Sequence, residues 1–138
     1  MRWIATIVTV VLLVATGWTL HAASQDALVR QAAGTLSVPD DWLMTSDSFR
    51  PSHLICASGR CPESTRSFHA KDATPRAISH VLERSGWQVT FDAPCEPAMT
   101  STPAACSASG TAYGVPVSLY IFGIHNDPGA ASVTIHVG

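Results

Sequence analysis

Residues 74–92 carry the signals of a helix that ends where a strand begins. The Thr74 hydroxyl can accept hydrogen bonds from the free amides of a first helical turn, and Pro75 suits the first helical position. Apolar residues then recur every three or four positions, and Gly86 suits the left-handed residue that closes a helix. From Trp87 the apolar period changes to two. This stretch therefore predicts a helix that packs on a sheet.

A strand is also predicted before this helix, over Thr65–Lys71, where short alternation is centred on Phe68. A strand, a helix and a second strand in this order form a β-α-β unit. Its two strands are expected to run parallel, with a right-handed crossover, either adjacent or with one strand between them.

The C-terminal third predicts further strands. Residues 107–124 form one strand region that a bend at Gly114 can divide, and apolar residues on both of its faces predict a central or doubly covered strand. A turn at residues 126–129 precedes a closing strand with one polar face, in which His136 is expected to lie opposite Ile121. Residues 45–52 are polar and are predicted to be a loop.

These elements predict an α+β fold: one helix packed on a mostly antiparallel sheet of about four strands, with two disulfide-bonded loops. A transmembrane or signal helix precedes this domain.

The N-terminal segment Trp3–Leu20 has eighteen residues without a charge, and Arg2 precedes it. As a helix it would span about 27 Å of a hydrocarbon layer of about 30 Å. Because basic residues stay in the cytoplasm, the chain after Leu20 is expected outside it. We expect a single-pass cell-membrane anchor. The alternative is a signal segment cleaved near Ser24, which would release a secreted protein.

The chain therefore divides into an anchor or signal segment (residues 1–23), a stalk or linker (24–38) and an extracytoplasmic domain (39–138). Ala27, Leu28, Ala32 and Leu36 have helical spacing, so the stalk is expected to continue the helix; a flexible tether is the alternative.

Four cysteines, Cys56, Cys61, Cys95 and Cys106, are expected to form disulfides, because the compartment outside the cytoplasm is oxidising. Three pairings are open. We favour Cys56–Cys61 and Cys95–Cys106, since each pair brackets a loop with turn residues. A metal-binding or redox role for the cysteines is the alternative, but the spacings lack a C-x2-C motif.

Asp40, Asp41 and Trp42 follow the predicted domain boundary at Pro39. An aromatic ring beside two carboxylates can form a sugar-binding platform, so these three residues are candidate ligand contacts. The interpretation we favour is that Trp42 anchors the edge of the domain, as one of the first residues to enter the core.

The composition argues against nucleic-acid binding. Without Arg2, seven basic residues face ten acidic ones, which gives a formal charge of −3 and no basic stripe. Phosphate-loop, dinucleotide-binding, zinc-protease and nucleophile-elbow motifs are also missing from the sequence. We predict no catalytic residues, no metal site and no cofactor.

The anchor, the P-D-D-W entry, the C-x4-C-P loop and the helix-to-strand junction together resemble small exported or membrane-anchored domains of unknown function from high-GC Gram-positive bacteria. The resemblance implies no activity, cofactor or site residue.

The sequence thus predicts a non-catalytic, membrane-tethered domain of the cell envelope that binds another envelope component, either a protein or a glycan. Two alternatives are a small secreted or tethered enzyme that acts on cell-wall material, and a metal-binding or redox protein that uses the cysteines.

Overall fold

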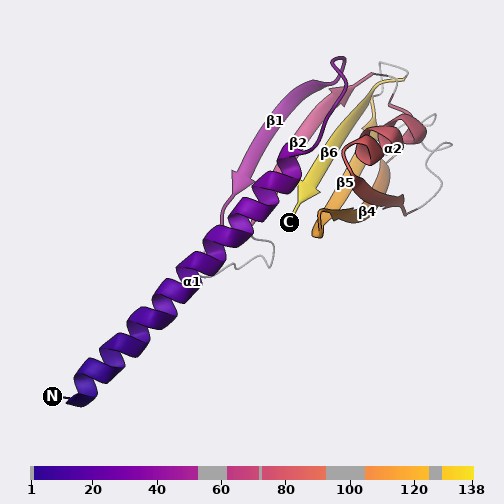
Figure 1. Ribbon diagram of the computed structural model, residues 1–138. Coiled ribbons are helices and arrows are strands. Elements are labelled where there is room, and N and C mark those ends of the chain that lie inside the picture. Colours follow the sequence, from indigo (N-terminus) through magenta and orange to yellow (C-terminus); the bar gives the residue numbers. More distant parts are fainter. Residues whose placement is uncertain (1, 53–61, 72, 93–104, 125–128) are drawn as a thin grey trace.

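The computed structural model describes residues 2–52, 62–71, 73–92, 105–124 and 129–138. Its elements are, in chain order, α1 (Arg2–Gly34), β1 (Leu43–Arg50), β2 (Glu63–Ala70), α2 (Pro75–Arg84), β3 (Trp87–Phe91), β4 (Ala105–Ala112), β5 (Val115–Gly123) and β6 (Ala131–Val137). Within the described residues, six strands form one sheet in the order β1-β2-β6-β5-β4-β3, and neighbours pair antiparallel (Figure 1). The α+β prediction is confirmed, but the expected number of about four strands is wrong.

The prediction of a loop over residues 45–52 is wrong, because β1 occupies most of this stretch. β1 is an edge strand that pairs only with β2 among the described residues. Phe49 is its one apolar side chain that is partly buried, whereas Leu43 and Met44 are exposed. Because most side chains of this edge strand are exposed, its sequence shows no alternation of apolar and polar residues from which a strand could be predicted.

The predicted junction between helix and strand is confirmed. Thr74 Oγ1 accepts a hydrogen bond from the Ala77 amide at 3.2 Å, and Pro75 opens α2. Ile78, Val81 and Leu82 are the buried residues of this helix. Gly86 adopts a φ of +77°, the left-handed conformation that glycine tolerates best.

The strands on either side of α2 run parallel, as expected, but they are not near neighbours. Three strands, β6, β5 and β4, separate β2 from β3. The chain crosses from β2 to the far edge of the sheet and returns through the meander β3-β4-β5-β6. The expectation of at most one intervening strand is therefore wrong, because a crossover helix fixes direction and leaves the number of intervening strands open.

The region 107–124 divides at the predicted place. Tyr113 and Gly114 have φ values of +52° and +80° and connect β4 to β5 in a tight hairpin. β5 is central in the sheet, but its second face is not covered, since Tyr120 and Phe122 are 39% and 46% exposed.

The predicted register of the last hairpin is wrong by three positions. His136 pairs with Ser118 and Ile121 pairs with Val133. The last pair of the ladder is Gly123 with Ala131, and residues 126–128 of the predicted turn lie outside the described residues. The alternation within β6 is nevertheless as predicted, with Val133, Ile135 and Val137 buried.

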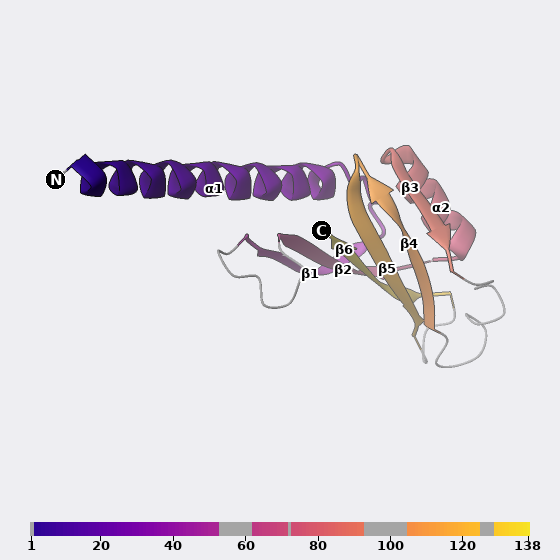
Figure 2. The same ribbon diagram turned by 90° about the horizontal axis from the view of Figure 1, so that it is seen from below.

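α1 joins the predicted apolar helix and the predicted stalk into one element (Figure 2). Its N-terminal half extends well beyond the sheet. The stretch Thr6–Gly34 is long and apolar enough to cross a membrane. Near the other end, Val29, Ala32 and Ala33 are buried in the same hydrophobic cluster as the sheet. The end of the helix is therefore part of the folded domain.

Both helices contribute to one core on one face of the sheet. The cluster joins α1 and α2 to the inward residues of the strands, such as Phe68, Leu119 and Ile135. Hydrogen bonds also connect the end of α1 to the end of α2: Trp87 Nε1 donates to Thr35 Oγ1 at 3.0 Å, and the Ser37 amide donates to Ser85 Oγ at 3.0 Å.

Three of the four cysteines, Cys56, Cys61 and Cys95, lie outside the described residues, so the predicted pairing stays a prediction. Cys106 lies in β4, is 6% exposed and has no free thiol.

Candidate functional site

The sheet has one covered face and one open face. Along β2, β5 and β6 the inward residues belong to the core, while the alternate residues point away from the helices. The outward residues are mainly hydroxyl-bearing, with two aromatic rings and two histidines, His69 and His136, among them. We call this set the open face; its members include Thr65, Ser67, Ser107, Ser109, Ser118, Tyr120, Phe122, Ser132, Thr134 and His136.

Glu63 and His136 form a close polar pair on the open face. His136 Nδ1 lies 2.7 Å from Glu63 Oε1 and 3.2 Å from Thr65 Oγ1. The Glu63 side chain is only 11% exposed, so its carboxylate has lost most of its water. Because the carboxylate is the nearer acceptor, it fixes the proton on Nδ1, and Nε2 of a neutral ring is left as an acceptor.

Arg50 and Tyr120 complete the surroundings of this pair. Arg50 Nη1 lies 3.9 Å from Glu63 Oε2, and 61% of the Arg50 side chain is exposed. The Tyr120 ring meets the His136 ring edge to face, with centroids 5.7 Å apart. The imidazole is thus held by a carboxylate on one side and an aromatic ring on another.

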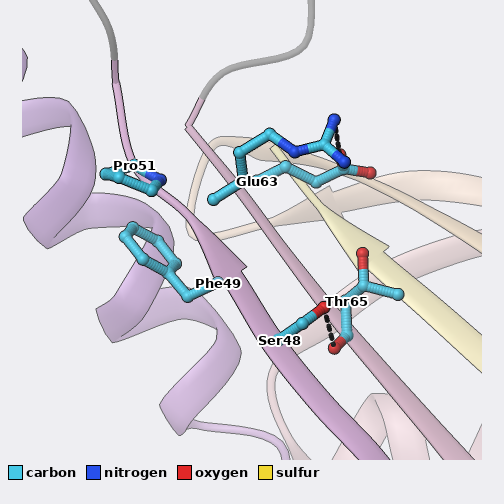
Figure 3. Close-up of a pocket in the computed structure, with 6 residues that line it drawn as sticks. Ser48, Phe49, Pro51, Glu63 and Thr65 are labelled. Atoms are coloured by element: carbon cyan, nitrogen blue, oxygen red, sulfur yellow. Dashed lines mark hydrogen bonds and ion pairs between the residues drawn. The ribbon is translucent and has the colours of Figure 1, made fainter.

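A hollow of about 220 Å³ lies beside Glu63, between the ends of β1 and β2 (Figure 3). Its lining comprises Ser48, Phe49, Arg50, Pro51, Glu63 and Thr65. The Ser48 hydroxyl points to the Thr65 carbonyl oxygen at 3.5 Å (Figure 3). Arg50 pairs with the carboxylate of Glu63. The hollow offers hydroxyl, carboxylate and guanidinium groups, which suits a polar ligand.

This arrangement resembles part of a general acid–base site. Within the described residues, the Thr65 hydroxyl lies 3.2 Å from His136, but it faces Nδ1, the nitrogen that donates to Glu63 and so does not act as its base. Ser118 is paired with His136 across the strands, yet no hydrogen bond joins their side chains in the part of the chain that the structure describes. A nucleophilic hydroxyl needs a base within hydrogen-bond reach. The pair therefore supports hydrogen bonding to a ligand better than covalent catalysis.

A second hollow, of about 440 Å³, lies on the other face of β1 and β2, beside α1. Its lining comprises Arg30, Ala33, Asp47, Phe49, Ser64 and Arg66. We call it the arginine hollow. The Arg30 guanidinium lies 3.7 Å from the centre of the Phe49 ring.

Arg66 is fixed in the arginine hollow by two partners. Its Nη1 donates to the Ala33 carbonyl oxygen at 2.7 Å, and its Nε lies 3.3 Å from Asp47 Oδ2. The first contact satisfies a carbonyl of the last turn of α1, where a cation is favoured. Nε is buried and makes no hydrogen bond of good geometry, so Asp47 acts on it mainly through charge.

The structure separates the three candidate ligand contacts predicted from the sequence. Trp42 is 7% exposed and packs against Phe68, with ring centroids 5.9 Å apart. Its ring therefore belongs to the core and does not form an open platform. Asp40 and Asp41 are exposed, and neither of the two hollows includes them.

Sequence reasoning missed the pair of Glu63 and His136, which are 73 residues apart. The polar face of β6 was predicted, and it contains His136. The pairing of β2 with β6 was not predicted, and without it no local pattern places a carboxylate beside this histidine. In the described residues no group of three or more histidine, cysteine or acidic side chains could hold a metal ion.

Comparison with known proteins found no match: no family model, characterised protein or solved structure matches the chain.

Proposed function

We propose that the protein is a non-catalytic domain of the cell envelope, tethered to the membrane outside the cytoplasm, that binds another envelope component through its open face. The observation that carries the proposal is the single helix α1, which is apolar over its first part and docked on the sheet at its end. Such a helix would hold the domain at a fixed height and orientation above the bilayer.

The height follows from the helix geometry. Asp26 Oδ1 accepts a hydrogen bond from the Ser52 amide at 2.8 Å, which brings the end of β1 to the level of Asp26. Asp26 follows the last apolar anchor residue, Leu20, by six positions, or about 9 Å along a helix. A headgroup layer is about 5–7 Å thick, so the domain would stand directly on the membrane surface.

Cleavage near Ser24 is the alternative, and it would leave the domain intact. The buried contacts of α1 come from Val29, Ala32 and Ala33, all of which follow Ser24. The same domain would then be secreted with a short docked helix. The proposed binding face does not depend on which form is present.

The open face supports a binding role because it combines hydroxyl groups with exposed aromatic rings. Tyr120 and Phe122 project from β5 beside His136 of β6. Aromatic side chains supply contact area at low entropic cost, and serine and threonine supply adaptable hydrogen bonds. The binding partner would be an envelope protein or a glycan.

We also propose the disulfides Cys56–Cys61 and Cys95–Cys106. Each would stabilise the domain by about 2–3 kcal/mol in the chain-entropy model. The buried position of Cys106 in β4 favours a structural role. Titration of free thiols in the denatured, unreduced protein tests this: none supports the disulfides, whereas four would favour a metal-binding or redox function.

A test of the binding role is site-specific photo-crosslinking in the native membrane. A photoreactive residue is placed at Tyr120 or Phe122 and, as the matched control, at Arg76, an exposed residue of α2. We expect a discrete crosslinked product from the two open-face positions and none from position 76. Equal crosslinking from all three positions, or from none, would contradict the proposal.

A further inference from the structure

We propose that the arginine hollow binds a phosphodiester group. The hollow of about 440 Å³ lies between α1 and the strands β1 and β2, away from the open face. Its volume falls within the range of small-molecule sites, so the hollow has room for more than a bare ion. The proposal relies on the proposed function only in placing this hollow outside the cytoplasm.

The charges in the hollow favour a singly charged anion. Arg30 and Arg66 contribute two positive charges and Asp47 one negative charge. Among the described residues, Arg30 forms no ion pair with a carboxylate, and its guanidinium lies over the ring of Phe49. The net charge of +1 is local, because the chain after Arg2 carries a formal charge of −3. A monoanion neutralises this charge, whereas a second negative charge would meet Asp47.

The guanidinium groups are prepared for such a ligand. Phe49 supports the plane of Arg30, and the Ala33 carbonyl oxygen and Asp47 orient Arg66. The two groups come from different elements, α1 and β2. Two separate guanidinium groups suit the two free oxygens of a phosphodiester, whereas a flat carboxylate is satisfied by one guanidinium fork.

Two sources can supply this group: a lipid headgroup, or a soluble or polymeric phosphodiester of the envelope. Arg30 follows Leu20 by ten positions, or about 15 Å along the helix. This height exceeds the headgroup layer of about 5–7 Å. The geometry therefore favours the soluble or polymeric source.

The test uses the full chain in nanodiscs and two probes. Glycerophosphoglycerol is titrated in solution against protein in zwitterionic nanodiscs, and the line width of its ³¹P signal is followed. In the second arm the nanodiscs contain phosphatidylglycerol, and the side-chain signals of ¹⁵N-arginine are followed. Saturable binding of the soluble probe supports the polymeric source, and a response only in the second arm supports the lipid source. No response in either arm overturns the proposal.

Variants separate the site from general charge effects. Arg30→Gln should weaken binding at least tenfold, while Arg30→Lys, which keeps the charge, should weaken it less. Arg76→Gln removes the same charge from an exposed position of α2 and should leave binding unchanged. If Arg76→Gln weakens binding as much as Arg30→Gln does, the arginine hollow is not the binding site. If N-acetylglycine, a carboxylate monoanion, binds as tightly as the phosphodiester probe, the proposed ligand class is wrong. Crosslinking from the open face is independent of these outcomes.

Discussion

The two faces of this sheet share the same strands but differ in what covers them. The inward face joins Phe68, Leu119 and Ile135 with the ends of two helices in one apolar cluster. The outward face of the same strands carries hydroxyl groups, aromatic rings and the pair of Glu63 and His136. Because side chains alternate along a strand, each strand contributes to stability on one face and to recognition on the other. Substitutions on the two faces should therefore have different consequences.

The largest difference in lost stability is expected between alanine substitutions of two phenylalanines. Phe68 is 1% exposed on the inward face, and Phe122 is 46% exposed on the open face. Phe68→Ala should lower the free energy of unfolding by about 3–5 kcal/mol, because it leaves a cavity in the core. Phe122→Ala should change it by less than about 1 kcal/mol. Urea unfolding of the full chain in detergent, followed by near-ultraviolet circular dichroism, measures both; equal losses would contradict the division between the faces.

The next-largest loss of stability is expected for a substitution where β3 and β4 approach each other closely. A Cβ atom built at Gly110 would lie 1.9 Å from the Gln88 carbonyl oxygen, so the two strands would have to separate. Gly110→Ala should cost about 1–3 kcal/mol of stability, the range found for overpacking. Gly34→Ala is the matched control, since nothing lies within 4 Å of a Cβ atom there. A neutral result at Gly110 in the same urea experiment would show that this edge of the sheet is looser than described.

Disrupting the pair of Glu63 and His136 should lower the free energy of unfolding by a similar or smaller amount. His136→Ala removes the nearest partner of a carboxylate whose side chain is 11% exposed, at a cost of about 1–3 kcal/mol. The double variant Glu63→Gln/His136→Ala should recover part of this loss, because the unpaired charge is gone. Ser132→Ala, on the same face of β6, serves as the control. Additive losses in the double-mutant cycle would mean that the pair contributes no coupling.

The smallest effect is expected at the cap of α2. Thr74→Ala removes the hydrogen bond from the Ala77 amide and should cost about 1 kcal/mol, whereas Thr74→Ser should cost little. Thermal unfolding monitored by far-ultraviolet circular dichroism is sensitive enough. Equal midpoints for the two variants would show that the cap does not stabilise α2.

These features differ in how far the sequence predicts them. The stretch from Thr74 to Trp87 was predicted because a cap, a proline, a glycine and a change of period all act locally. The division of residues 107–124 at Gly114 was predicted for the same reason, although as a bend and not as a hairpin. Local signals of this kind need no knowledge of which strands pair.

Features that depend on long-range pairing were missed. β1 was predicted as a loop because most of its side chains are exposed, and the crossover to β3 was expected to be shorter. The pair of Glu63 and His136 and the arginine hollow both arise where segments distant in sequence meet. Asp40, Asp41 and Trp42 were candidate ligand contacts because they are adjacent in sequence. The favoured alternative, that Trp42 enters the core, agrees with its exposed fraction of 7%.

One helix runs from the apolar anchor into the folded domain, and the proposed position of the domain at the membrane depends on this continuity. Hydrogen–deuterium exchange of the full chain in nanodiscs tests it most directly over residues 26–34. If α1 is docked as described, these amides should exchange at least about a hundredfold more slowly than an unstructured chain, as the amides of α2 should. Exchange at the rate of an unstructured chain would show a flexible tether and would contradict the account.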